Sequence, residues 1–367
     1  MKCTMSKDSN SPHLCTRILW GVDERREALE HALTSQRIPL AVESTCAWAR
    51  RFRRRTALVV VSAKDGEPIW GFGLESTRTR ALPGYVILRA PKFRADAPTG
   101  ALRAGLEALI RLSRESRVLR VDLEVYCPKS DFPANVPSIL IDSGFRVGEI
   151  QRTYLHTVVV DLTPSVEEIF ASFHQTGRRH IRAARKHPVV VRPITNSALG
   201  PRMNELRAES FHRTSGRFHD EDWGAWIHLA NDSPHLARVV GMFEVSDSGE
   251  EQLIAYALAV VNGDVAEYRT AASTRHTALK IPLLYAPSWE LILWAKDQGA
   301  EIFDWGGVSL GSSTQDHARR GINEFKYYFS KQVVEVGSEY SFEPSRLRSA
   351  AAKALRRAGT VLGFGGE

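Results

Sequence analysis

Apolar positions along the chain predict the same order of secondary-structure elements twice. In the first half, three strand-like runs, a helical period and a further strand follow one another at 57–62, 69–76, 85–89, 100–114 and 119–126. The second half repeats this order at 237–245, 253–261, 264–271, 283–298 and 301–305. The halves share negligible sequence identity, so the repeat is one of pattern. Each half is therefore predicted to form a hairpin, a helix and a strand.

The strongest hairpin signal is Asn262-Gly263, which lies between two apolar runs. A tight type I′ turn needs positive φ at both central residues, and asparagine and glycine adopt that conformation readily. We therefore predict a turn centred on these two residues. In the helix that follows, Pro282 fits near the opening turn, whereas Pro287 either kinks the helix or marks its true start.

Residues 165–186 are expected to form two helices, either between the copies or at the opening of the second. If the second helix starts at Arg178, then Arg182 and Arg185 follow at i+4 and i+7, and three guanidinium groups share one face. Guanidinium groups match phosphate or carboxylate oxygens two at a time. Thr176 adds a hydroxyl beside them. The pattern favours an anion site, and a solvated helix face is the alternative.

Size and charge indicate two domains and an anionic partner. With 367 residues, 43% of them hydrophobic, two domain-sized cores are the natural expectation, with a boundary near 150–157. The formal net charge of +7 comes from arginine clusters, notably at 50–55 and 346–357. A polyanion or a phosphorylated ligand fits this charge, and improved solubility is the alternative. The second cluster predicts a basic amphipathic helix suited to anionic lipid or to nucleic-acid phosphates.

The cysteines show no spacing for zinc and no disulfide framework, which fits a reducing cytoplasm; they are Cys3, Cys15, Cys46 and Cys127. The histidines likewise predict no metal site. Residues 1–16 begin with a polar stretch, so we expect a disordered segment and no signal peptide. The longest apolar run, 253–261, has about half of the roughly 20 residues that a spanning helix requires.

Five short motifs follow one another in an order and at spacings that are specific as a set. They are Glu43-Ser-Thr-Cys-Ala-Trp-Ala-Arg50, Gly144-Phe145 ahead of Thr157-Val-Val-Val-Asp-Leu162, Thr176-Gly-Arg-Arg-His-Ile-Arg182, Asp304-Trp-Gly-Gly-Val308 and Gly321-Ile-Asn-Glu-Phe-Lys326. Together they resemble the Fem-type tRNA-dependent aminoacyltransferases, the family that includes the enzymes building peptidoglycan cross-bridges. The resemblance covers almost the whole chain.

The resemblance implies a mixed α/β fold with two GNAT-like acyltransferase lobes in tandem. We expect the lobes at 17–156 and 157–342, followed by a basic C-terminal helix or tail at 343–367. Some members carry a coiled-coil arm, for which this chain leaves no room, so it resembles the compact form. Two positions depart from the family pattern. Gly177 precedes Arg178 where a threonine is common, and Phe329-Ser330-Lys331 stands where Gly-Phe-Gly-Gly is frequent.

The reaction that the resemblance implies transfers an amino acid from the 3′ end of its tRNA to a primary amine. The acceptor is a peptide or muropeptide precursor, or a small peptide of secondary metabolism. Aminoacyl-tRNA is the co-substrate, and no cofactor and no metal are expected. We also expect a cytoplasmic monomer, with contact to a membrane surface as an option.

The resemblance also implies roles for individual residues in the second half. Lys326 and Phe325 of the Phe-Lys pair are assigned to catalysis, because Lys326 matches a lysine near the tRNA terminus that stabilises developing negative charge. Arg178, with Thr176 and Arg182, matches the side chains that bind an acceptor phosphate. The alternatives are a solvated lysine and surface ion pairs.

Four further residues each have a structural interpretation to weigh beside a functional one. Asp122 matches an acidic residue that accepts a proton or binds the acceptor amine, although a solvent-facing strand carboxylate is the alternative. Tyr268 resembles a tyrosine that reaches the acceptor, and a half-buried strand tyrosine is the competing interpretation. Trp48 is either a substrate contact or packing. Asp304 precedes Gly306-Gly307, where a turn-capping role is favoured.

Two other functions remain open. An acyl-CoA-dependent N-acyltransferase shares the fold but needs a pyrophosphate loop at a helix N-terminus. Neither 94–100 nor 275–280 has the required spacing of arginine or glutamine and glycines. A non-catalytic binder of RNA or membrane would leave the Phe-Lys and Thr-x-Arg motifs unexplained.

Overall fold

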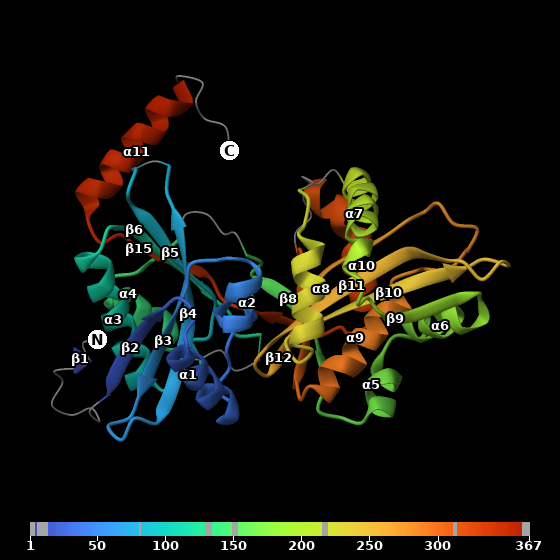
Figure 1. The fold of residues 1–367 in the computed structure, drawn as a ribbon, viewed down its shortest axis with the longest axis horizontal. Helices are drawn as coiled ribbons and strands as arrows, with labels where there is room; N and C mark the ends of the chain where they lie inside the picture. The colour runs from blue at the N-terminus through green and yellow to red at the C-terminus, as the bar shows by residue number, and fades with distance from the viewer. Residues whose placement is uncertain are drawn as a thin grey trace. The chain divides into compact units, whose positions relative to one another are not determined.

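The computed structural model describes residues 4–5, 14–80, 82–128, 134–148, 153–214, 219–310 and 314–361. The chain divides into two compact units (Figure 1). Unit 1 comprises residues 1–153 and 336–367, and unit 2 comprises residues 154–335. Each unit has its own sheet, and each repeats the order of elements that the hydrophobic pattern predicts.

Within the described residues of unit 1, the sheet has the strand order β1-β2-β3-β4-β5-β6-β15-β7. The strands are β1 Thr4–Met5, β2 Cys15–Trp20, β3 Thr56–Ser62, β4 Pro68–Arg78, β5 Val86–Phe93, β6 Val118–Val125, β7 Arg146–Val147 and β15 Glu339–Phe342. The helices are α1 Glu24–Ser35, α2 Cys46–Arg51, α3 Thr99–Glu115, α4 Val136–Asp142 and α11 Arg346–Val361. Only the β5–β6 pair is parallel among these strands, because α3 connects the two.

Alternation along β3 explains why this sheet is covered on both faces. Val59 and Val61 belong to the core that includes α3, whereas Leu58 and Val60 pack with Leu33 of α1. Successive strand residues point to opposite faces, so a run of β-branched residues serves two cores at once. The sheet is therefore enclosed between α3 on one side and α1 on the other.

Unit 2 has a second sheet, with the described strand order β14-β8-β13-β12-β11-β10-β9. Its strands are β8 His156–Asp161, β9 Val189–Pro193, β10 Ala237–Val245, β11 Glu251–Asn262, β12 Val265–Ser273, β13 Ile302–Gly307 and β14 Val333–Glu335. Its helices are α5 Val166–Ser172, α6 Gln175–Ala183, α7 Gly200–Thr214, α8 Trp223–Asp232, α9 Tyr285–Asp297 and α10 Thr314–Tyr327. Here β12–β13 is the parallel pair, connected through α9.

The same alternation covers both faces of this second sheet. Ala257 of β11 belongs to the core that contains Trp289 and Leu291 of α9. Its neighbour Tyr256 points the other way and meets Trp223 of α8 edge-on, with ring centroids 4.7 Å apart. The doubled pattern of hairpin, helix and parallel strand is thus confirmed, and it gives two mixed α/β units that share the same order of elements.

The β11–β12 hairpin is confirmed, but its turn differs from the prediction. Asn262 pairs with Val265 in the ladder, so the two turn residues are Gly263 and Asp264. Gly263 has φ of 73°, and Asp264 has no positive φ. Positive φ at the first turn position alone is the type II′ pattern, so the type I′ assignment is wrong.

Residues 336–342 belong to unit 1, so the expectation that they form part of the second lobe is wrong. β15 pairs antiparallel with β6, with Tyr340 opposite Leu123. It occupies the place beside β6 that β8 occupies beside β13 in unit 2. The chain therefore returns to its first sheet, because β6 needs a partner for its outer edge.

The N-terminal expectations also need correction. Cys15 and Thr16 belong to β2, and Thr4–Met5 pairs with it, so these residues of the 1–16 segment are ordered. Cys15 is disulfide-bonded, whereas Cys46 and Cys127 are free and buried, so the expectation of no disulfide is wrong at Cys15. The rest of that segment lies outside the described residues.

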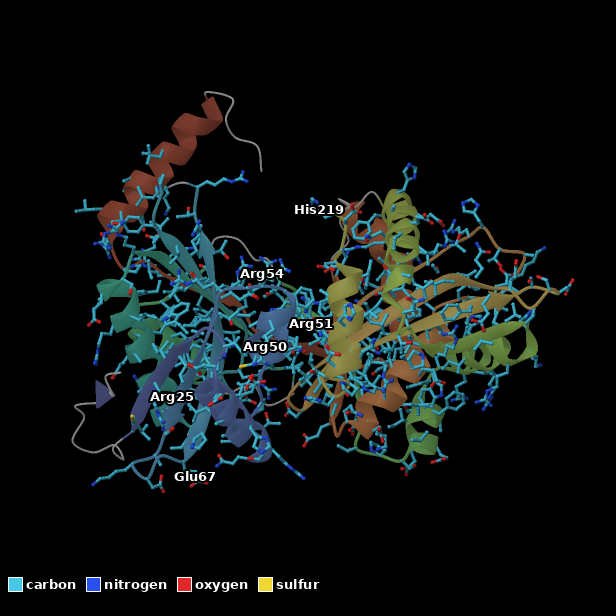
Figure 2. All side chains as sticks on the ribbon, in the orientation of Figure 1. Arg25, Arg50, Arg51, Arg54, Glu67 and His219 are labelled. Carbon is cyan, nitrogen blue, oxygen red and sulfur yellow. The ribbon has the colours of Figure 1, made fainter. Side chains whose placement is uncertain are left out.

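The arginine cluster at 50–55 does not act as one group. Arg50 pairs with Glu27 of α1, and Arg55 lies over the ring of Trp20, 5.4 Å from its centroid. Arg50 and Arg51 end α2, and Arg54 follows it (Figure 2). Within the described ranges, every helix is too short or too polar to cross a bilayer.

Candidate functional site

Lys326 lies near the C-terminal end of α10 and is only 7% exposed. Its ammonium donates hydrogen bonds to the carbonyl oxygens of Gly306 and Gly307, at 3.0 and 2.6 Å. A buried ammonium is stable only when it is hydrogen-bonded, and these carbonyls meet that need. They therefore hold a positive charge at one fixed place in unit 2.

A bulge in β13 presents these two carbonyls. The register between β13 and β8 shifts between Asp304 and Gly307, and Gly306 has φ of 73°, where glycine is favoured. A side chain at Gly307 would place its Cβ 2.4 Å from the Cβ of Tyr154. The Gly-Gly pair thus serves two purposes: one glycine turns the backbone, and the other makes room for a tyrosine.

A buried carboxylate fixes the bulge. Asp304, with 0% exposure, accepts hydrogen bonds from the Gly306 amide at 2.7 Å, from the Tyr154 hydroxyl at 2.9 Å and from the Thr157 hydroxyl. The Thr157 hydroxyl also lies 2.8 Å from the Gly306 carbonyl oxygen that Lys326 contacts. Asp304 therefore caps the turn, and its partners connect it to the site of the ammonium.

A second buried carboxylate, Glu267, lies directly opposite Asp304 on the neighbouring strand β12. Its Oε2 accepts a hydrogen bond from the Asn262 amide at 3.2 Å, and its Oε1 lies 3.4 Å from the Tyr154 hydroxyl. Tyr154 thus bridges both carboxylates. Its hydroxyl proton can serve one carboxylate at a time, and Asp304 is the nearer of the two.

An aromatic cluster forms the other side of the Lys326 region. Phe325 contacts Tyr285 and Trp305 edge-on, with centroids 4.9 and 5.5 Å apart, and Tyr268 lies at 6.4 Å. Tyr268 is half-buried, and its ring lies 4.9 Å from that of Trp305. The structure therefore brings Lys326, Phe325 and Tyr268 together and gives Phe325 a packing role.

A cationic cavity of about 570 Å³ lies along α6 and the 3₁₀ turn Ala184–Lys186 that follows it. It is lined by Gln175, Thr176, Arg178, Arg179, Arg182, Ala183 and Lys186. The three residues predicted to bind phosphate, Thr176, Arg178 and Arg182, therefore share one cavity. Four cationic side chains around one hollow are suited to an anion with several oxygens.

Arg185 does not belong to this cavity, which corrects the predicted trio of guanidinium groups. The helix starts at Gln175, capped by His174, and a 3₁₀ turn follows at Ala184–Lys186. Lys186 of that turn lines the cavity, whereas Arg185 does not. Arg185 instead interacts with Glu290 of α9. Burial raises the pKa of the Glu290 carboxyl, and the positive charge of Arg185 counteracts part of that rise. Sequence spacing alone did not reveal this change of helix type.

Two of the predicted phosphate ligands also have contacts within the protein. Arg178 donates hydrogen bonds to the carbonyl oxygens of Ala171 and Phe173, so it caps the end of α5. The guanidinium of Arg182 lies 4.9 Å from the ring centroid of Phe170. Arg178 is therefore partly structural, whereas Arg182 stacks on an aromatic face that leaves its edge for hydrogen bonds.

Gly177 connects the cationic helix to the helix of Lys326. The amide of His174 donates to the Tyr328 carbonyl oxygen at 2.9 Å, and a Cβ at Gly177 would lie 2.8 Å from the same oxygen. Only glycine allows α6 to approach this backbone so closely. Glycine at this position therefore has a packing reason.

Asp122 and Trp48 belong to unit 1, whereas the residues above belong to unit 2. Asp122 is 1% exposed and pairs with Arg120, with 2.8 Å between Oδ1 and Nε. Trp48 is buried on α2 and stacks on Phe52, with ring centroids 3.8 Å apart. The structure gives Trp48 a packing contact, and the solvent-facing alternative for Asp122 is wrong.

Burial shifts the pKa of several side chains near the cationic helix toward the neutral form. It raises the pKa of the Tyr268 hydroxyl and that of the Tyr285 hydroxyl, so both are neutral at physiological pH. Burial and the neighbouring Arg179 lower the pKa of His180, whose ring lies 4.8 Å from that of Tyr285. These groups act as neutral hydrogen-bonding or packing residues. In the described part of the chain, no group of histidine, cysteine and carboxylate side chains is arranged to hold a metal.

Sequence reasoning missed Tyr154, Thr157 and Glu267 as members of the network around Asp304, and Arg179 and Lys186 in the cavity. Tyr154 and Thr157 are far from Asp304 in the chain. A signal was present only for the cavity, because Arg178, Arg182 and Lys186 follow one another at i+4.

No family model matches the chain, and a search of curated proteins finds no match. Solved structures do match. FemX is similar with a TM-score of 0.71 at 14% identity, over 88% of this chain and 96% of FemX. The C-terminal domain of a putative lysylphosphatidylglycerol synthetase from Agrobacterium fabrum has a TM-score of 0.49 at 15% identity, over 92% and 96%. A tandem GNAT protein from the clavulanic acid biosynthesis pathway has 0.47 at 15%, over 90% and 99%.

The likeness to FemX shows that this chain has the same fold, and it agrees with the two units described above. Unit 2 combines a fixed ammonium, a pair of buried carboxylates of which Asp304 bonds the adjacent glycine turn, and a cationic cavity on α6. Such an arrangement can stabilise an oxyanion and bind an anionic group.

Proposed function

We propose that the protein is an aminoacyltransferase that moves an amino acid from aminoacyl-tRNA to a primary amine on a phosphorylated or peptide acceptor. The observation that carries the proposal is the buried ammonium of Lys326, held by two glycine carbonyls in the motif that resembles the Fem-type family. The fold shared with FemX supports it. Aminoacyl-tRNA is the donor, and no further cofactor is needed.

In this reaction the amine attacks the carbonyl carbon of the ester. A carbon–nitrogen bond forms, the bond to the tRNA ribose oxygen breaks, and a proton passes from the amine to the leaving hydroxyl or to solvent. The ester already stores the free energy for the amide, so the enzyme must align the reactants and stabilise the oxyanion. Lys326 is proposed to supply that stabilisation, because its charge is fixed before the substrate arrives.

Asp304, Thr157 and Tyr154 are proposed to act through Lys326. They hold the bulge whose carbonyls receive the ammonium, so they fix the position of the charge. A charge that needs no reorganisation during the reaction stabilises a transition state better than one that must move. These three are positioning residues.

The cavity on α6 is proposed to bind the acceptor's phosphate. Arg179, Arg182 and Lys186 line it, together with the hydroxyl of Thr176. Tyr268 is proposed to contact the acceptor through its hydroxyl, which is neutral at physiological pH and can donate a hydrogen bond. Asp122 as a proton acceptor and Trp48 as a substrate contact remain predictions from the family resemblance.

The test of this proposal uses purified full-length protein, a mixed pool of radiolabelled aminoacyl-tRNA and a panel of amine acceptors. Half of each sample is treated with ribonuclease before the acceptor is added. Amide product that requires intact tRNA supports the proposal. Product that forms only from added acyl-CoA, and is insensitive to ribonuclease, would replace it by the N-acyltransferase alternative.

A further inference from the structure

The last helix of unit 1, α11, has an apolar face that packs against nothing in the described structure. Ser349 and Ala352 are buried on the side that faces the sheet. On the other side, Leu347 is 85% exposed and Leu355 is 53% exposed, and Ala351 lies between them at helical spacing. Figure 1 shows this helix at the end of unit 1, beyond β6 and β15. Leu347, Ala351 and Leu355 therefore form a small exposed apolar face on this helix.

A cationic cavity of about 690 Å³ lies under the start of this helix. Five cationic side chains and two carboxylates line it, namely Arg114, Arg120, Arg146, Arg346 and Lys353, with Asp122 and Glu343. They come from α3, β6, β7 and α11 and from the residues between β15 and α11. The cavity is separate from the one on α6, because all of its lining residues belong to unit 1.

The two carboxylates of this cavity are already paired. Asp122 pairs with Arg120 at 2.8 Å, and Glu343 lies 3.5 Å from the ammonium of Lys353. Across the described residues, Arg146 and Arg346 have no carboxylate partner, so the cavity keeps a positive excess. Guanidinium groups gathered without counter-charge repel one another, and an anion with several oxygens removes that repulsion.

The exposed leucines decide which anion fits. A free phosphate or a nucleic-acid backbone would satisfy the arginines but would leave Leu347 and Leu355 in water. An anionic bilayer satisfies both, because its headgroups carry phosphate and its interface accepts apolar side chains just below them. The sequence of α11 contains no acidic residue, which removes the main source of repulsion from such a surface.

We propose that α11 and the cavity beneath it form a binding site for the phosphate headgroup of an anionic phospholipid at a bilayer surface. Arg146 and Arg346 bind the headgroup phosphate, and Leu347 and Leu355 enter the interface. The helix lies in the plane of the surface and does not cross it. This site is independent of the chemistry proposed for Lys326, since its residues belong to the other unit.

The experiment measures binding of the full-length protein to phosphatidylcholine vesicles with and without phosphatidylglycerol, by co-sedimentation. We expect binding only with phosphatidylglycerol. Leu347→Ser with Leu355→Ser should weaken it about tenfold. Arg146→Gln with Arg346→Gln should weaken it by about fivefold for each charge removed. Thermal unfolding of each variant, compared with the wild type, checks that the fold is kept.

Control variants remove the same kinds of side chain, exposed leucines and arginines, from other parts of the protein surface. Leu310→Ser changes an exposed leucine of unit 2, and Arg25→Gln with Arg51→Gln removes two surface charges from unit 1. These variants should bind like the wild type. Equal weakening by the control pair would show general charge attraction and overturn the site.

Competition experiments separate the sources of phosphate. Glycerol phosphate, added at the same phosphate concentration as the vesicles, should displace little protein. It offers no apolar interface for Leu347 and Leu355 to enter. Full displacement by it would show a soluble phosphate site and overturn the lipid assignment. Loss of vesicle binding to added tRNA, with no effect of the leucine variants, would assign the cavity to nucleic acid instead.

Discussion

Replacing Lys326 by methionine should abolish most of the activity because it removes a positive charge. The accompanying loss of stability should not account for the effect. Methionine keeps much of the length of the side chain but has no charge and no donor. The carbonyls of Gly306 and Gly307 would each lose a hydrogen bond, at a cost of roughly 1–3 kcal/mol of stability per buried carbonyl. The lost charge should lower kcat about 10²- to 10³-fold, which is typical for removal of one oxyanion-stabilising group.

The chain offers a matched control in Lys296 of α9. Its ammonium donates to the carbonyl oxygens of Leu162 and Pro164, at 2.8 and 2.7 Å, and so has the same pair of bonds as Lys326. Lys296→Met should cost similar stability and leave kcat within about twofold of the wild type. Single-turnover transfer of a labelled aminoacyl group, with thermal unfolding of both variants, measures the two effects separately. Equal loss of kcat in the two variants would refute the electrostatic role.

Three other predictions address the helix α6. Gly177→Ala forces a Cβ to within 2.8 Å of the Tyr328 carbonyl and should destabilise the protein by about 1–3 kcal/mol, whereas Gly321→Ala, with nothing within 4 Å, should be neutral or stabilising in urea unfolding. Arg182→Ala should raise the acceptor KM by roughly tenfold, while Arg185→Ala should not, since Arg185 faces α9. The pKa of His180 is lowered by burial, so as the pH falls the unfolded chain binds a proton at this residue before the folded chain does. Stability from this residue is complete above the ordinary histidine pKa of about 6.5 and falls as the pH drops below it. His180→Phe should reduce the acid sensitivity of the unfolding midpoint, and an unchanged pH profile would contradict this.

Local patterns in the sequence were sufficient to predict much of the fold. The strand predicted at 237–245 has the same first and last residues as β10. The helix α9 begins at Tyr285, so Pro287 lies in its first turn. These elements follow from apolar periodicity, which depends on residues close in the chain. The cationic cavity was predictable in part for the same reason, because Thr176, Arg178 and Arg182 lie on one helix, although Lys186 and not Arg185 completes its lining.

Interactions between distant residues were not predictable. β15 returns to pair with β6 after an entire second unit, and no local pattern records that pairing. The Asp304 carboxylate accepts hydrogen bonds from Tyr154 and Thr157, which lie about 150 positions earlier in the chain. The roles of Gly177 and Gly307 likewise depend on which backbone or side chain approaches them, which only the folded structure reveals.

The most direct test of the central claim supplies both donor classes at once. The protein is mixed with aminoacyl-tRNA that carries one isotope in the amino acid and acyl-CoA that carries another in the acyl group, together with the amine acceptors. The isotope found in the purified amide identifies the donor. We predict label from aminoacyl-tRNA alone, and its disappearance in Lys326→Met. Label from acyl-CoA alone would contradict the account.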